Sequence, residues 1–320
     1  MKEINRRILG VAVTLILVAT LATPLTSTVL AKKATGTDMG NYTQYVGTLG
    51  GANYVIRIPD GWNGGLVVGC RGYMGAVWFP DAQFVMDGLV NGDGISLPLA
   101  LVEQGFAYAA SSYGEGGFAI KEAMIRTHQL TEYVIGKFGV TGKVFVIGHS
   151  MGGAIALLLG EKYPELYDGV LDISGMRDIV LGYTDSVQGI ADIEAISEEE
   201  WSTIPPPMQA YLTQLLALLK QMTADMEVQF GGTYDKKPQH YEKLNPVDNA
   251  EISIPMISVT GTLDQVSVNQ AHTFENAVAE TGCSEYYRLY MVPFGDHNNA
   301  ITVDAALSHF AELVNYPVGW

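Results

Sequence analysis

One serine of the sequence lies between two glycines where two hydrophobic patterns meet. Ser150 is the centre of Gly148-His-Ser-Met-Gly152, after the apolar run 143–147 and before the helical pattern 151–163. The glycine pattern alone is a weak indication, because short motifs also arise by chance. A strand that turns directly into a helix, however, exposes the hydroxyl and directs helix amides toward developing negative charge. The sequence therefore predicts that Ser150 is a nucleophile and that the Met151 amide is an oxyanion donor.

A serine hydroxyl needs a base to become nucleophilic, and the base needs an acid that orients it. Among the six histidines, His297 follows the predicted strand 286–292 in a loop at the carboxyl edge of the sheet. Open α/β sheets place their sites at this edge, so His297 is the predicted base. His149, inside the glycine motif, is predicted to point away from the reaction partner of the serine.

The acid is predicted from the same edge of the sheet. Asp264 follows the strand 254–260, and the chain order Ser150, Asp264, His297 is the one expected when the serine lies on a strand-to-helix turn. Asp172, at the end of the strand beside that of Ser150, is the alternative acid.

Short apolar runs alternate with helical patterns along most of the chain. Strands are predicted at 53–58, 66–70, 106–111, 143–147, 167–173, 254–260 and 286–292, and helices at 119–138, 151–163, 271–279 and 305–314. This alternation predicts an α/β fold with a mostly parallel sheet that helices cover on both faces.

Residues 176–249 interrupt the alternation. They contain Pro205-Pro-Pro207, which opens an apolar helix predicted to run from Met208 to about Met222. A helix with so wide an apolar face must be buried on more than one side. We therefore predict a helical lid or cap insertion at 176–249, with the α/β core formed by residues 32–175 and 250–320.

The first 31 residues have the pattern of a secretory signal peptide. Lys2, Arg6 and Arg7 precede the uncharged run 8–31, which ends in Val-Leu-Ala. The run is also long enough to span a bilayer, so an uncleaved N-terminal anchor is the alternative. The predicted location is secreted or extracytoplasmic, at the cell surface if the anchor is kept.

Composition excludes several classes of partner. The formal net charge is −16 and no basic patch follows Lys32-Lys33, which argues against binding to nucleic acid or to an anionic membrane surface. The sequence has no histidines and carboxylates at the spacing of a zinc site, no Walker motif and no dinucleotide fingerprint. We therefore expect no metal and no cofactor. The two cysteines, Cys70 and Cys283, are too few for a disulfide scaffold, and Cys70 is expected to be a buried thiol.

These motifs together resemble the α/β-hydrolase superfamily, and within it exported serine hydrolases of the esterase and lipase type. The segments that carry the resemblance are Ile58-Pro-Asp-Gly-Trp-Asn-Gly64, Gly72-Tyr73, Tyr108-Ala-Ala-Ser-Ser-Tyr113, Gly148-His-Ser-Met-Gly-Gly153 and Tyr163-Pro-Glu-Leu-Tyr-Asp-Gly169. The resemblance implies an α/β-hydrolase fold and a second oxyanion donor, the Tyr73 amide, in the loop after 66–70. Arg71-Gly72 departs from the His-Gly of that family, and a cation there would favour acidic substrates.

The expected reaction is hydrolysis of a small or medium carboxylic ester through an acyl-enzyme intermediate. The same three residues also allow a peptidase or amidase, or an acyltransferase that uses another acceptor. A non-catalytic binding protein that retains the fold is the alternative from a different class.

Overall fold

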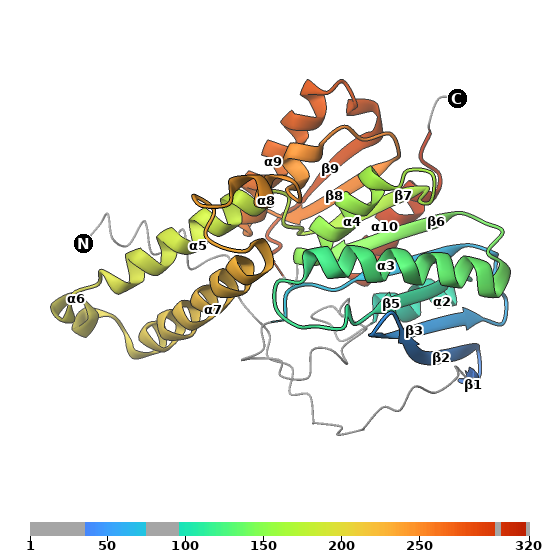
Figure 1. Cartoon of the computed structure of the whole chain (residues 1–320), viewed down its shortest axis with the longest axis horizontal. Coiled ribbons are helices and arrows are strands. Elements are labelled where there is room, and N and C mark those ends of the chain that lie inside the picture. The colour runs from blue at the N-terminus through green and yellow to red at the C-terminus, as the bar shows by residue number, and fades with distance from the viewer. Residues whose placement is uncertain (1–35, 75–95, 298–301, 318–320) are drawn as a thin grey trace.

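The computed structural model describes residues 36–74, 96–297 and 302–317 of the chain (Figure 1). The predicted signal peptide, residues 1–31, lies outside the described residues. Among the helices of the described ranges, none is both long and apolar enough to cross a membrane.

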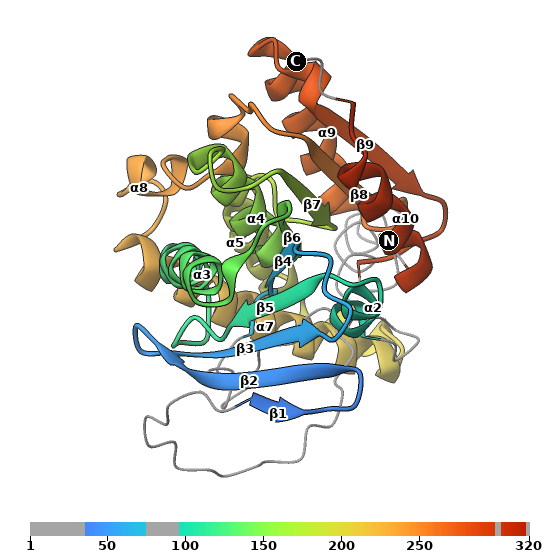
Figure 2. The ribbon, with the colours of Figure 1, turned by 90° about the vertical axis from the view of Figure 1, so that its right-hand side faces the viewer.

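The described strands form one sheet of nine, in the order β1-β2-β3-β5-β4-β6-β7-β8-β9 (Figure 2). β1, β2 and β3 pair in antiparallel fashion, and β3 is antiparallel to β5, whereas all the pairs from β5 to β9 are parallel. The strands span Gly36–Asp38 (β1), Tyr42–Leu49 (β2), Ala52–Pro59 (β3), Leu66–Cys70 (β4), Ala107–Ser111 (β5), Val144–His149 (β6), Gly169–Ile173 (β7), Met256–Gly261 (β8) and Tyr287–Val292 (β9). The predicted mostly parallel sheet is confirmed.

Helices cover both faces of this sheet because its central strands bury side chains on both sides (Figure 2). Val146 of β6 packs with one set of helices, and its neighbour Ile147 packs with the other set. The first set is α3 (Ile120–Val134), α4 (Met151–Lys162) and α9 (Gln265–Glu280); the second is α2 (Leu97–Glu103) and α10 (Val303–Val314). A short π-helix (η2, Ile135–Gly139) follows α3, and a short 3-10 helix (η4, Ser284–Tyr286) precedes β9.

The segment 176–249 folds into helices that extend from the sheet as an arm (Figure 1). They are α5 (Ile179–Glu194), α6 (Glu198–Thr203), α7 (Pro206–Phe230), α8 (Pro238–Glu242) and the 3-10 turn η3 (Pro246–Asn249). Apolar residues of α5 and α7 form a cluster of their own, centred on Ile193, Leu212, Leu215 and Leu219. At its other end α7 joins the main core through Met226 and Phe230.

Helix α7 is eight residues longer at its C-terminal end than the predicted helix 208–222. Met222, Met226 and Phe230 continue its apolar spacing, and the helix ends only at Gly231, whose φ of 78° is left-handed. The extra two turns bring α7 back to the sheet.

Candidate active site

Ser150 occupies the sharp turn between β6 and α4. Its φ of 58° and ψ of −126° are strained for a residue with a side chain. The Ser150 N–H donates to the Ile173 carbonyl at 3.1 Å, and the Ser150 carbonyl accepts from the Met176 N–H at 3.0 Å. A Cβ at Gly148 would collide with the Gly152 carbonyl, so the turn needs glycine there. Hydrogen bonds from β7 and the chain after it thus hold the strained turn that exposes the hydroxyl.

The structure brings Ser150, His297 and Asp264 together from three separate loops. His297 Nε2 lies 3.0 Å from Ser150 Oγ, and His297 Nδ1 lies 2.7 Å from Asp264 Oδ2. A neutral imidazole that donates from Nδ1 to the carboxylate leaves Nε2 free to accept the serine proton. The distances therefore suit proton transfer from Ser150 to His297.

Asp264 is fully buried at the N-terminus of α9, where its Oδ1 also accepts a hydrogen bond from the Ser267 N–H at 3.3 Å. Burial by itself raises the pKa of this carboxyl group. The hydrogen bonds from His297 and Ser267 outweigh burial, so that the pKa of Asp264 lies below its ordinary value. Asp264 therefore stays ionised beside the imidazole at neutral pH.

Asp172, the alternative acid, has other partners. Its Oδ2 lies 2.6 Å from Arg177 Nε and accepts a hydrogen bond from Ser258 Oγ at 2.7 Å. The Asp172 and Arg177 side chains are both fully buried. Among the described contacts of His297 none involves Asp172, so the geometry favours Asp264 as the orienting acid.

His149 lies against His297, and the prediction that it points away is wrong. His149 Nε2 donates to the backbone carbonyl of His297 at 2.9 Å, and the two ring centroids are 5.2 Å apart. Burial, followed by the charge of His297, lowers the pKa of His149 from 6.5 to about 4. His149 is therefore a neutral donor that supports the His297 loop. Its place at the end of β6 was visible in the sequence, but its rotamer was not.

The loop after β4 runs beside the serine. A Cβ at Gly72 would lie 3.2 Å from Ser150 Cβ, so the backbone here approaches the serine closely, and Tyr73 follows at once. On the other side of the serine, Met151 begins α4, so its N–H lies at the helix N-terminus, where an amide lacks the carbonyl partner four residues earlier in the helix. The two amides predicted as oxyanion donors thus belong to segments that flank Ser150.

Arg71 does not present a free cation to a substrate, contrary to the expectation from the sequence. Its side chain is buried, and Nη2 donates to the carbonyls of Ser112 at 3.0 Å and Glu115 at 2.8 Å. The guanidinium also lies over the Tyr113 ring, 4.4 Å from its centroid. Arg71 therefore connects two backbone segments beside the serine.

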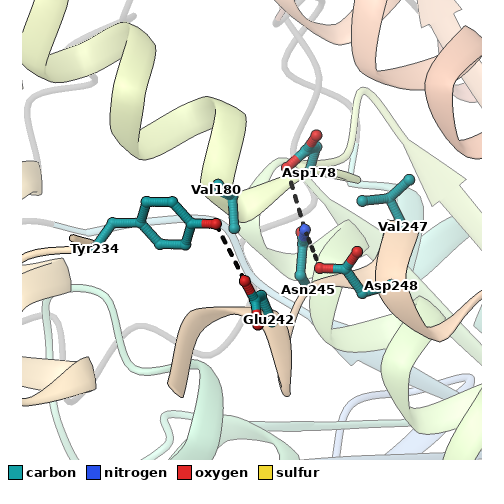
Figure 3. A pocket seen from close by; sticks show the side chains of 7 residues that line it. All are labelled: Asp178, Val180, Tyr234, Glu242, Asn245, Val247 and Asp248. Atoms are coloured by element: carbon teal, nitrogen blue, oxygen red, sulfur yellow. Dashed lines mark hydrogen bonds between the residues drawn. The ribbon is translucent and has the colours of Figure 1, made fainter. Parts of the chain in front are cut away.

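A pocket of about 420 Å³ lies elsewhere, where the insertion joins the core (Figure 3). It is lined by Asp178, Val180, Tyr234, Glu242, Asn245, Val247 and Asp248. Asn245 Nδ2 donates to Asp178 at 3.2 Å and to Asp248 at 2.9 Å. The bond to Asp178 connects the two ends of the segment 176–249. Because Ser150 and its partners do not line this pocket, it is separate from the candidate active site.

Neither a metal cluster nor a disulfide is seen in the described part of the chain. Its His, Cys, Asp and Glu side chains form no group of three or more that could hold a metal ion. Cys70 and Cys283 are both free thiols. Burial raises the pKa of Cys70 to about 12, as expected for a buried thiol.

Comparison with solved structures gives the same fold. The chain is 14% identical to an esterase/lipase from an uncultured bacterium, with a TM-score of 0.55 over 92% of this chain and 94% of that one. It is also 14% identical to an esterase from Pyrococcus furiosus, with a TM-score of 0.54 over 86% of this chain and 90% of that one. It is 13% identical to an acylaminoacyl peptidase from Pyrococcus horikoshii, with a TM-score of 0.56 over 88% of this chain and 43% of that one.

Four of the similar structures are peptidases whose chains are much longer than this one. The chain spans only 35% to 43% of the length of four such structures. No curated protein matches the chain in sequence. At these identities the solved structures establish the fold alone.

Sequence comparison with protein families identifies the family itself. The Esterase family model matches residues 124–300, more than half of the chain. The matched region contains Ser150, Asp264 and His297. This match agrees with the parallel sheet and with the strand-to-helix turn at Ser150. The chain belongs to the Esterase family and has an α/β-hydrolase fold.

Proposed function

We propose that the protein hydrolyses carboxylic esters through an acyl-enzyme intermediate on Ser150. The observation that carries the proposal is a chain of two hydrogen bonds. Ser150 Oγ lies 3.0 Å from His297 Nε2, and His297 Nδ1 lies 2.7 Å from Asp264 Oδ2. Nucleophile, base and orienting acid in this order are the parts that acyl transfer requires.

In the first half of the reaction, Ser150 Oγ attacks the ester carbonyl carbon while His297 Nε2 takes the hydroxyl proton. Asp264 keeps the imidazole in the tautomer that accepts at Nε2 and stabilises the imidazolium that forms. The amides of Met151 and Tyr73 donate to the oxygen of the tetrahedral intermediate. The intermediate then collapses, and His297 returns its proton to the departing alcohol.

In the second half, a water molecule takes the place of the alcohol. His297 removes a proton from the water as its oxygen attacks the acyl carbonyl, and the same two amides stabilise the second oxyanion. Collapse breaks the bond to Ser150 Oγ, which takes the proton back from His297, and releases the carboxylic acid.

The proposed substrate is a small or medium ester, and the proposed role of the segment 176–249 is that of a lid or cap. Hydrolysis of amides is a second candidate, because acylaminoacyl peptidases share the fold. A non-catalytic binding protein would not need Ser150 to be within hydrogen-bond distance of His297.

Substitution of Ser150 tests the proposal. Ser150→Ala removes the nucleophile and should lower kcat on p-nitrophenyl esters by on the order of 10⁶. Circular dichroism should show the fold unchanged. Activity within tenfold of the wild type would contradict the role of Ser150.

A substrate series separates the two candidate reactions. p-Nitrophenyl esters of increasing acyl length and aminoacyl p-nitroanilides should be compared under the same conditions. We expect turnover of the short and medium esters. Turnover of the anilides alone would assign the protein to the peptidases.

A further inference from the structure

The side chain of Tyr73 connects the loop beside Ser150 to the helical insertion. Its hydroxyl donates to Asp225 Oδ2 at 2.7 Å, and Asp225 lies on α7, 152 positions further along the chain. Burial, followed by the bond to Asp225, raises the pKa of Tyr73, so the hydroxyl keeps its proton and remains a donor. The bond is partly buried and charge-assisted, the kind that holds two segments most firmly.

Asp225 is itself held in place. Its second oxygen, Oδ1, accepts a hydrogen bond from Gln221 Nε2 at 2.8 Å, one turn earlier on α7. A Cβ at Gly117 would lie only 2.9 Å from Asp225 Oδ2, so the carboxylate packs directly on that glycine. The Gly117 N–H in turn donates to the Met74 carbonyl at 2.8 Å. The carboxylate therefore contacts Tyr73 and the segment that pairs with Met74.

The loop 71–74 depends on such side-chain contacts because it has little secondary structure of its own. Within the described ranges, the isolated bridge between Met74 and Gly117 is the one backbone pairing that joins it to another segment. Arg71 fixes the start of the loop through the Ser112 and Glu115 carbonyls. Asp225 holds the Tyr73 side chain, two residues further along.

We propose that Asp225 is a positioning residue of the active site, which holds Tyr73, and with it the Tyr73 amide, in place beside Ser150. The inference rests on the proposed function, because it requires the Tyr73 amide to be an oxyanion donor. It makes α7 a support of the catalytic loop, so the insertion is needed for the chemical step as well as for any selection of substrate.

Three variants test this positioning, with p-nitrophenyl acetate as substrate. Asp225→Ala and Tyr73→Phe each remove the bond and leave the Tyr73 amide present. Each should lower kcat by on the order of 10- to 100-fold with little change in KM, since a displaced oxyanion donor weakens the transition state more than the ground state. Asp225→Asn keeps an acceptor oxygen and should restore most of the lost kcat.

The double variant Tyr73→Phe with Asp225→Ala measures whether the two side chains act through one contact. It should be no slower than the slower single variant, because the contact is lost only once. Losses that multiply would overturn the proposal.

Glu227→Ala is the matched control. Glu227 lies on the same helix and accepts a hydrogen bond from the Tyr183 hydroxyl at 2.8 Å, within the insertion. Its loss should leave kcat within about twofold of the wild type, although the melting temperature falls. The proposal is overturned if Glu227→Ala slows the enzyme as much as Asp225→Ala, or if Asp225→Ala keeps the wild-type kcat.

Labelling of Ser150 by a fluorophosphonate separates this proposal from the proposed function. If wild-type protein is not labelled, the proposed function fails and the positioning role fails with it. If the wild type is labelled and Asp225→Ala reacts at the same rate, only the positioning role of Asp225 is contradicted. Slower labelling of Asp225→Ala, with normal labelling of Glu227→Ala, supports it.

Discussion

Asp264 and Asp172 show how the partners of a buried carboxylate determine what it does. Both side chains are fully buried, and both follow or end a strand of the parallel sheet. Asp264 accepts from His297, whereas Asp172 is paired with Arg177. In sequence they were alternatives for one role, because nothing in the residue types reveals which carboxylate faces the imidazole.

Separate substitutions should give opposite results at these two positions. Asp264→Asn should lower kcat by roughly 10⁴, because the imidazole loses the acceptor that fixes its tautomer. Asp172→Asn leaves Arg177 buried without its carboxylate and should lower the free energy of unfolding by about 3 kcal/mol, with kcat little changed. Steady-state kinetics and urea unfolding of both variants check this. A fully active Asp264→Asn would transfer the acid role to Asp172.

His149 predicts a pH dependence of stability. Its pKa is about 4 in the folded protein, against about 6.5 unfolded. Between these values the unfolded chain takes up a proton that the folded protein does not. The free energy of unfolding should therefore fall as the pH drops from 6.5 to 4, by at most about 3 kcal/mol from this residue.

His149→Gln checks the source of that dependence. Glutamine can still donate to the His297 carbonyl but does not titrate. The melting temperature of the variant should fall less than that of the wild type between pH 7 and pH 5. If the melting temperatures of the two proteins fall equally, groups other than His149 determine the pH dependence of stability.

At the scale of elements, the turn at Ser150 requires α4 to lie close to the start of the loop 71–74. A Cβ at Gly152 would collide with the backbone carbonyls of Cys70 and Arg71. Gly152→Ala should therefore lower the free energy of unfolding by about 1 to 3 kcal/mol, as overpacking does. Gly136, in η2, has no atom within 4 Å of such a Cβ. Gly136→Ala should leave stability unchanged or slightly higher. Equal effects in denaturant unfolding would contradict the close packing.

The strands of the parallel part of the sheet could be predicted because burial on both faces gives them continuous apolar runs. β2 was not predicted: it lies near the sheet edge, half of its residues are polar or glycine, and all are at least partly exposed. α9 begins at Gln265, six residues before the predicted start, because Asp264 caps it. The spacing of apolar residues indicates which side chains are buried. It does not predict helix caps or strands at the exposed edge of a sheet.

The Tyr73–Asp225 contact could not be predicted by any such pattern. The two residues lie far apart in the chain, and Asp225 occupies an ordinary polar position of a long helix. Only the path of α7 back to the sheet brings them together. Contacts of this kind depend on tertiary packing, which leaves no local signal in the sequence.

For the molecule as a whole, the family match and the sheet agree on an α/β-hydrolase. Export with cleavage after Ala31 stays a prediction, since those residues lie outside the described part of the chain. The net charge of −16 disfavours the approach of a polyanion.

Intact-mass and peptide mass spectrometry after treatment with a fluorophosphonate test the central claim most directly. The folded wild-type protein should gain one phosphonyl adduct, on Ser150, with loss of fluoride, because His297 activates that hydroxyl and the oxyanion donors stabilise the transition state of the displacement. Ser150→Ala and urea-unfolded protein should gain none. A folded wild-type protein that stays unmodified, or that is modified at another residue, would contradict the account.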